Sequence, residues 1–192
     1  GELSANFQFI FENSGVMRDG VIYTIKTMSD FDGKQITLGD VMDKDVVSES
    51  YFIPENKLYY TDSSVTHSDE SLEKLPREKR QTWQYLKGAK KLPRKAKNGH
   101  EYIFSEGAIP MIDSYDKPAR TMLTSEGSFS RTTHIVKDKK TGKIRLLTAE
   151  ETERIQGFPT GHTKYCDVNG KIVEIPTNKR RFMMGNALVV NL

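Results

Sequence analysis

The sequence predicts an α+β protein. A small, mostly β domain with short helices covers residues 1–145, and a capped helix and a terminal segment follow over residues 146–192. Short apolar runs separated by turn-forming residues recur through the first part, as is typical of strands joined in hairpins. A complete set of helix start and stop signals is found near residues 148–157.

The expected elements follow from local patterns. Phe7–Phe11 and Val21–Ile25 alternate and predict two strands of a hairpin joined by a Gly-containing turn. Ile36–Met42 predicts a short helix capped by Thr37, and the acidic stretch Asp43–Glu73 predicts surface loops. The other expected elements are a strand-like patch at Lys57–Tyr60, a helix over Ser71–Tyr85, strands at Glu101–Phe104, Thr121–Thr124 and Thr132–Val136, and a turn at Asp138–Lys143.

The helix near residues 148–157 is defined at both ends. Thr148 and Glu151 have the spacing of a capping box, which satisfies two backbone N–H groups at a helix start. Gly157 stands where a left-handed C-cap is expected, and Pro159 prevents continuation. We expect its individual side chains to have a structural role, in which they pack one domain against another.

The last residues predict a turn of the backbone near the end of the chain. Gly185 and Asn186 interrupt the chain before the apolar run Ala187–Val190. A Gly-Asn turn that leads into a helix would leave free N–H groups facing a ligand. The alternative is a buried helix cap with no ligand.

Composition excludes several classes of protein. The 192 residues are 36% hydrophobic and 29% charged, and no apolar run approaches the roughly 20 residues of a membrane span. The single cysteine, Cys166, excludes an internal disulfide and fits a reducing, cytoplasmic location. The four histidines lack metal-ligand spacing, so no metal site is expected.

Charge is distributed unevenly. Residues 1–76 hold 6 Lys/Arg against 14 Asp/Glu, residues 77–145 hold 17 against 7, and residues 146–192 hold 6 against 5. Residues 77–97 alone carry nine basic side chains and one acid. A basic middle segment is typical of a surface that faces nucleic acid, although such a run is also often a solvated helix face. Trp83 and Tyr85, which lie within it, are expected in the core.

Two motifs carry a family resemblance. Residues 145–159, RLLTAEETERIQGFP, and residues 185–189, GNALV, resemble motifs IX and X of DNA (cytosine-5) methyltransferases. The resemblance implies a target-recognition domain followed by a segment that returns to a catalytic domain. It also implies that Gly185, Asn186 and Ala187 help to bind S-adenosylmethionine.

The middle of the chain resembles the recognition region of one bacterial branch of this family. Trp83–Lys91 and Gly99–Tyr102 carry this likeness, and Thr121 with Met122 matches a pair that precedes a Gly/Ser loop in the DNA major groove. Arginine forks suit guanine, and Glu126 suits a cytosine amino group. The expected DNA-binding residues are Lys90, Lys91, Arg94, Lys95, Arg120, Thr121, Ser125, Glu126, Ser128 and Arg131.

The catalytic motifs of the family do not occur in this sequence. Cys166 lies between Tyr165 and Asp167, not after a proline, and neither Glu-Asn-Val nor Phe-x-Gly-x-Gly is present. We therefore expect the site-recognition half of a bacterial or phage restriction–modification enzyme, inactive alone. Its catalytic half would be a separate subunit or the rest of a longer chain. The alternative is a stand-alone, non-enzymatic DNA-binding module.

Overall fold

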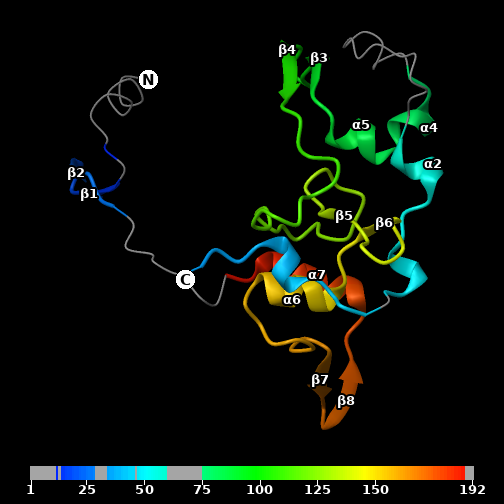
Figure 1. Ribbon diagram of the computed structural model, residues 1–192. Helices are drawn as coiled ribbons and strands as arrows, with labels where there is room; N and C mark the ends of the chain where they lie inside the picture. The colour runs from blue at the N-terminus through cyan, green and yellow to red at the C-terminus, as the bar shows by residue number, and fades with distance from the viewer. Residues whose placement is uncertain (1–11, 13, 29–33, 46, 60–74, 189–192) are drawn as a thin grey trace. The chain divides into compact units, whose positions relative to one another are not determined.

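The computed structural model describes residues 12, 14–28, 34–45, 47–59 and 75–188. The chain divides into two compact units, Gly1–Gln35 and Ile36–Leu192 (Figure 1). The expected domain boundary at 145/146 falls inside the second unit, within strand β6 (Ile144–Leu146) and shortly before helix α6 (Ala149–Ile155). Within the described ranges, no helix is long and apolar enough to cross a membrane.

The first unit contains one antiparallel hairpin. Strand β1 (Ser14–Arg18) pairs with strand β2 (Val21–Ile25). The two turn residues, Asp19 and Gly20, have φ of 50° and 77°, as a tight two-residue hairpin turn requires. The strand predicted at Val21–Ile25 is confirmed, but its partner is β1, and Phe7–Phe11 lies outside the described residues.

Short helices begin the second unit. The 3-10 helix η1 (Leu38–Val41) is capped by Thr37, as predicted, and Asp40 completes the capping box. A second 3-10 helix, η2 (Glu49–Tyr51), is followed by helix α2 (Glu55–Leu58). The predicted strand at Lys57–Tyr60 was therefore wrong at Lys57 and Leu58. Leu58 is instead the last residue of α2 and packs against Trp83 in the core.

The helix predicted over Ser71–Tyr85 is two helices in its described part. These are α4 (Arg77–Arg80) and α5 (Trp83–Lys87). The break falls at Thr82, whose hydroxyl donates to the carbonyl oxygen of Lys79 at 2.8 Å. A threonine that bonds local backbone in this way is favoured at a helix start.

The described strands form four two-stranded antiparallel sheets, so the α+β class is confirmed. Beside β1–β2, these are β3 (Lys90–Lys95) with β4 (Glu101–Glu106), β5 (Ile135–Lys137) with β6, and β7 (Tyr165–Val168) with β8 (Lys171–Glu174). The predicted strand at 101–104 and the turn at 138–143 are confirmed. The strand at 121–124 was wrong, because this stretch is irregular, and 132–136 is a strand only from Ile135.

Strand β5 connects the two parts of the core. Val136 packs with Leu38 and Leu147, whereas its neighbour Ile135 packs with Leu58 and Trp83. Successive side chains of a strand point to opposite faces, so one short strand supplies both clusters. Trp83 is a core residue, as expected.

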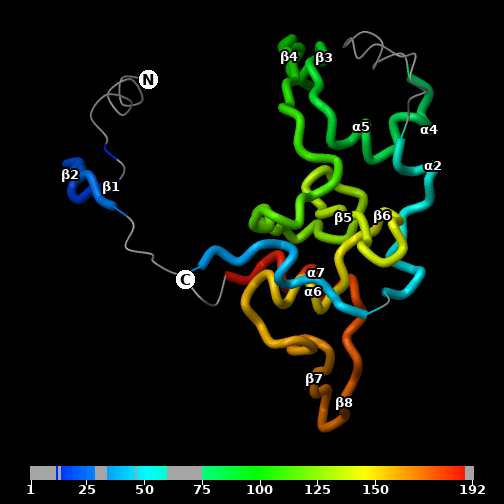
Figure 2. The backbone as a smooth tube through the Cα atoms, viewed as in Figure 1, coloured from blue at the N-terminus to red at the C-terminus, as the bar shows by residue number. Residues whose placement is uncertain are grey.

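Helix α6 lies beside helix α7 (Thr177–Asn186), as the backbone trace shows (Figure 2). The capping box of α6 and the left-handed Gly157, with φ of 80°, are confirmed. The predicted Gly185–Asn186 turn into a helix was wrong. Both residues form the last turn of α7, and Ala187 is its C-cap.

Candidate nucleic-acid interface

Arg145 is the buried centre of a charged cluster at the start of the 145–159 stretch. Its guanidinium, 1% exposed, donates to both carboxylate oxygens of Glu151 at 2.8 Å and to Asp138 at 3.2 Å. Glu151 also accepts the backbone N–H groups of Thr148 at 2.8 Å and of Asp43 at 2.9 Å. Removing one partner of such a buried pair costs about 3–5 kcal/mol, so this cluster fixes the start of α6.

A second charged cluster joins α6 to α7. Arg180 donates to Glu150 at 2.7 Å and to Glu153 at 2.9 Å. Glu153 also accepts the N–H of Gly161 at 2.6 Å and the hydroxyl of Thr163. Burial raises the pKa of the Glu153 carboxyl, but the hydrogen bonds from Thr163 and Arg180 outweigh it and hold that pKa below its usual value.

The charged side chains of the 145–159 stretch all have hydrogen-bond partners within the fold. Arg154 likewise donates to Asp43 at 2.5 Å and to the Val41 carbonyl at 2.7 Å. Gln156 donates to the Met184 carbonyl at 2.9 Å. These side chains therefore hold the stretch to the rest of the fold, in agreement with the expected structural role.

Helix α7 also touches the loop at residues 121–133. A Cβ atom added at Gly185 would lie 2.3 Å from the carbonyl carbon of Leu123, and one added at Gly127 would lie 2.4 Å from the Arg181 side chain. Only glycine fits where two segments approach so closely. Arg181 itself is buried and donates to the Leu147 carbonyl at 2.7 Å. The loop thus rests directly on α7.

Arg120 lies at one end of this loop, bound to the protein itself. Its Nε and Nη2 donate to the two oxygens of Asp113 at 2.6 and 3.1 Å, and Nη1 donates to the Thr132 carbonyl at 3.1 Å. Burial raises the pKa of Asp113, but the bonds from Arg120 and from the Ile135 N–H outweigh it and lower that pKa. The guanidinium has its acceptors within the fold.

Lys87 joins the same buried cluster. Its ammonium group donates to the Thr133 carbonyl at 2.7 Å and lies 3.9 Å from Asp113. Burial lowers the pKa of this lysine from 10.5 to about 8, because a charged ammonium loses its hydration there.

Glu126 is buried beneath the loop. Its carboxylate accepts the His134 backbone N–H at 3.1 Å and lies 2.8 Å from His134 Nδ1. The carboxylate therefore does not face the surface as expected for a cytosine contact. Ser128 donates to the Ser125 carbonyl at 2.6 Å. The exposed residues of the loop are Thr121, Leu123, Thr124, Ser128 and Phe129.

The end of the basic segment forms strand β3 of the β3–β4 hairpin, a strand that sequence reasoning missed. Lys90, expected at DNA, is buried and donates to the carbonyls of Leu86 and Gly88 at 3.1 Å each. Burial lowers its pKa, although Glu106, 3.5 Å away, opposes this. Lys90 therefore stabilises the start of the hairpin through hydrogen bonds and does not lie at the surface.

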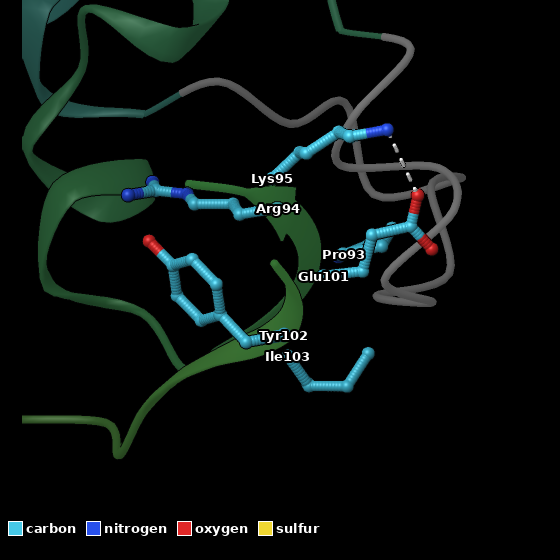
Figure 3. Close-up of a pocket in the computed structure, with 6 residues that line it drawn as sticks. All are labelled: Pro93, Arg94, Lys95, Glu101, Tyr102 and Ile103. Atoms are coloured by element: carbon cyan, nitrogen blue, oxygen red, sulfur yellow. Dashed lines mark ion pairs between the residues drawn. The ribbon is translucent and has the colours of Figure 1, made fainter. Parts of the chain in front are cut away.

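Beyond this base the hairpin is exposed. Arg94 stacks on Phe104, with 3.7 Å between its central carbon and the ring centre. Lys95 lies 3.5 Å from Glu101. Figure 3 shows Arg94 and Tyr102 extending to one side of an open pocket, and Lys95 and Glu101 to the other. Pro93 and Ile103 complete its lining.

The expected DNA-binding residues thus separate into two groups. The exposed group consists of Lys91, Arg94, Lys95, Thr121 and Ser128. The other group is wholly or partly enclosed by the fold. In it, Lys90 and Glu126 are buried, and Arg120, Ser125 and Arg131 are partly buried with internal partners. Sequence reasoning did not single out Phe104, and it included Tyr102 only in the likeness of Gly99–Tyr102. The signal that identifies them is the register, which places Arg94 opposite Tyr102 and Leu92 opposite Phe104 on one face.

The three residues expected at S-adenosylmethionine have different surroundings. Gly185 meets the Leu123 backbone, and the Ala187 N–H donates to the Met184 carbonyl at 3.2 Å. Asn186 is exposed, and its amide nitrogen donates to the Phe182 carbonyl at 3.1 Å. Among the described residues, no three His, Cys, Asp or Glu side chains are grouped as metal ligands.

Comparison with known proteins agrees with the two motifs. The family model for C-5 cytosine-specific DNA methylases matches residues 11–192. The chain therefore belongs to the C-5 cytosine-specific DNA methylase family.

A particular relative is the Type II methyltransferase M.Sau3AI of Staphylococcus aureus. It is 38% identical over 191 residues, which cover 100% of this chain and 38% of that protein. The chain thus spans well under half the length of this relative. No solved structure matched the chain.

Proposed function

We propose that this chain is the site-recognition part of a DNA (cytosine-5) methyltransferase in a restriction–modification system. It binds duplex DNA and positions it, while a catalytic half transfers a methyl group from S-adenosylmethionine to cytosine C5. That half is either a separate subunit or the rest of the same chain. The observation that carries the proposal is the match of residues 11–192 to the family, in a sequence whose one cysteine follows tyrosine.

The chemistry of the reaction supports this division. Attack on the cytosine ring needs a thiolate nucleophile, and covalent catalysis depends on how that group is activated. Cys166 lies in β7 and follows Tyr165, so it lacks the Pro-Cys context. In contrast, the exposed basic hairpin β3–β4 provides charges of the kind that neutralise DNA phosphates.

Of the three residues expected at the methyl donor, Asn186 fits it best. Its exposed amide suits the carboxylate or amino group of an amino-acid ligand. Gly185 and Ala187 fit less well, since the first packs on Leu123 and the second ends α7. The donor, when bound, supplies the methyl group, and this chain contributes one edge of its site.

Methyl transfer from labelled S-adenosylmethionine to DNA tests the proposal. The isolated chain should bind duplex DNA but transfer no methyl group above a blank. Addition of a polypeptide that contains the Pro-Cys and Phe-x-Gly-x-Gly segments should produce activity. Activity from the isolated chain would contradict the division of labour, and a chain that binds no duplex at all would contradict the recognition role.

A further inference from the structure

The structure distinguishes three arginines that look alike in the sequence. Every nitrogen of the Arg120 guanidinium has an acceptor within the fold. Arg131 donates to the Gly107 carbonyl at 2.6 Å and lies 3.7 Å from Glu106, with a quarter of its side chain exposed. Arg94 is exposed, and within the described part of the chain its guanidinium contacts the face of the Phe104 ring. Among these residues no acceptor occupies its hydrogen-bond donors, so they are available to a ligand.

Stacking holds this available guanidinium in place. Arg94 and Phe104 are diagonal neighbours on one face of the hairpin, because Arg94 pairs with Tyr102 and Leu92 with Phe104. A guanidinium on an aromatic face keeps its planar fork while it loses side-chain freedom. Such a preorganised fork binds a planar, two-acceptor partner with less entropy cost.

The hairpin has the dimensions of a groove-binding ribbon. Leu92 is the last buried residue of β3, and Pro93, Arg94 and Lys95 beyond it are exposed. Three residues of strand rise about 10 Å, which matches the roughly 8.5 Å depth of the DNA major groove. Two paired strands lie about 4.8 Å apart, and the groove, about 12 Å wide, admits a two-stranded ribbon.

Charge favours nucleic acid over a protein partner at this tip. Arg94, Lys95 and Lys97 are exposed there, and of the acids in the described part of the chain, Glu101 lies opposite Lys95 and pairs with it. An ion pair this exposed contributes little, so both lysines are able to contact phosphates. Arg94 extends to the other side of the hairpin from Lys95 (Figure 3), so its fork is left for the bases.

We propose that the β3–β4 hairpin enters the major groove of duplex DNA and that Arg94, held on Phe104, reads a guanine there. Guanine presents two acceptors, N7 and O6, that match an arginine fork. This inference rests on the proposed recognition role. It moves base selection from the 120–131 loop, where Arg120 and Glu126 are bound internally, to the hairpin.

Selection from a randomised duplex library tests the inference with the full chain. The parent should enrich a motif that contains guanine. Arg94→Lys keeps the charge but removes the fork, so it should lose about 5- to 150-fold discrimination at one base pair and keep the rest of the motif. Phe104→Leu should weaken the same position. Arg80→Lys, an exposed arginine of the basic segment, is the matched control.

The outcomes separate the two proposals. If the parent binds no duplex, the recognition role is wrong, and this inference falls with it. A parent that enriches a motif which Arg94→Lys leaves unchanged contradicts the inference alone, as does a parent that binds every duplex equally. A thermal melt of each variant shows whether the fold is retained. A uniform loss of affinity with Arg94→Lys, at an unchanged motif, reassigns Arg94 to phosphate.

Discussion

At the scale of single residues, side-chain type did not determine role. From sequence alone, Arg94, Arg120 and Arg131 were all candidates for guanine, and base selection was expected in the 120–131 loop. Folding brings Asp113 and the Thr132 carbonyl to Arg120, whereas Arg94 meets an aromatic ring. These partners lie 7, 12 and 10 positions away along the chain, so local patterns do not reveal them. Buried polar groups need partners, and the partners come from tertiary structure.

Lys87 gives a prediction at this scale. Its pKa is about 8 in the folded chain against 10.5 as the reference value, so the unfolded chain binds more protons between these two pH values. The free energy of unfolding should therefore rise with pH from about 8 to 10.5, by up to about 3 kcal/mol. Lys87→Met should lack this rise, which urea denaturation at several pH values measures.

Comparison with Lys117→Met, at an exposed position, controls for the loss of a lysine. The difference in stability between the parent and Lys87→Met should change across this window, whereas the difference between the parent and Lys117→Met should stay flat. Parallel curves for the parent and Lys87→Met would show that the buried ammonium does not titrate there.

At the scale of elements, helix α6 was predictable because its signals are local. The capping box at Thr148 and the stop at Gly157 depend on neighbours a few residues away. Strand β3 was not predictable in this way, because lysines interrupt its pattern of alternating apolar residues. One of them, Lys90, is nevertheless buried by folding. Gly185 was interpreted as a break before a helix, but it lies in the last turn of helix α7. Glycine is required there because the Leu123 backbone approaches closely, and no local sequence pattern shows that contact.

Gly185→Ala should destabilise the chain. The added Cβ would lie 2.3 Å from the Leu123 carbonyl carbon and oxygen, so α7 or the loop must move. Overpacking of this kind costs about 1–3 kcal/mol, which exceeds the gain of up to about 1 kcal/mol from the better helix propensity of alanine. A thermal melt measures it. Asn186→Ala, at the exposed neighbouring position, should melt near the parent. An alanine variant at 185 as stable as the parent would mean that the close approach to Leu123 relaxes freely.

At the scale of the whole molecule, the sequence predicted the family and the basic middle but not which surface the charges form. Residues 77–145 carry 17 Lys/Arg against 7 Asp/Glu. Folding uses several of these, including Lys87, Lys90 and Arg145, in internal bonds. The exposed remainder includes the β3–β4 hairpin. The charge on a protein surface therefore depends on which side chains the fold exposes and not on the number of charged residues in the sequence.

DNA affinity should consequently depend on where a charge lies. Lys95→Ala combined with Lys97→Ala removes two exposed charges from the hairpin. Binding to all duplexes should weaken alike, and the slope of log affinity against log salt should flatten by up to about 1.8, at about 0.9 per lost phosphate contact. Lys139→Ala with Lys171→Ala removes the same charge from exposed positions elsewhere and should leave the slope nearly unchanged. If both pairs flatten it equally, net charge attracts the DNA and the hairpin does not contact it. Titrations at several salt concentrations distinguish these results, because a bound phosphate contact releases counterions and a distant charge is screened within about 10 Å at 0.1 M salt.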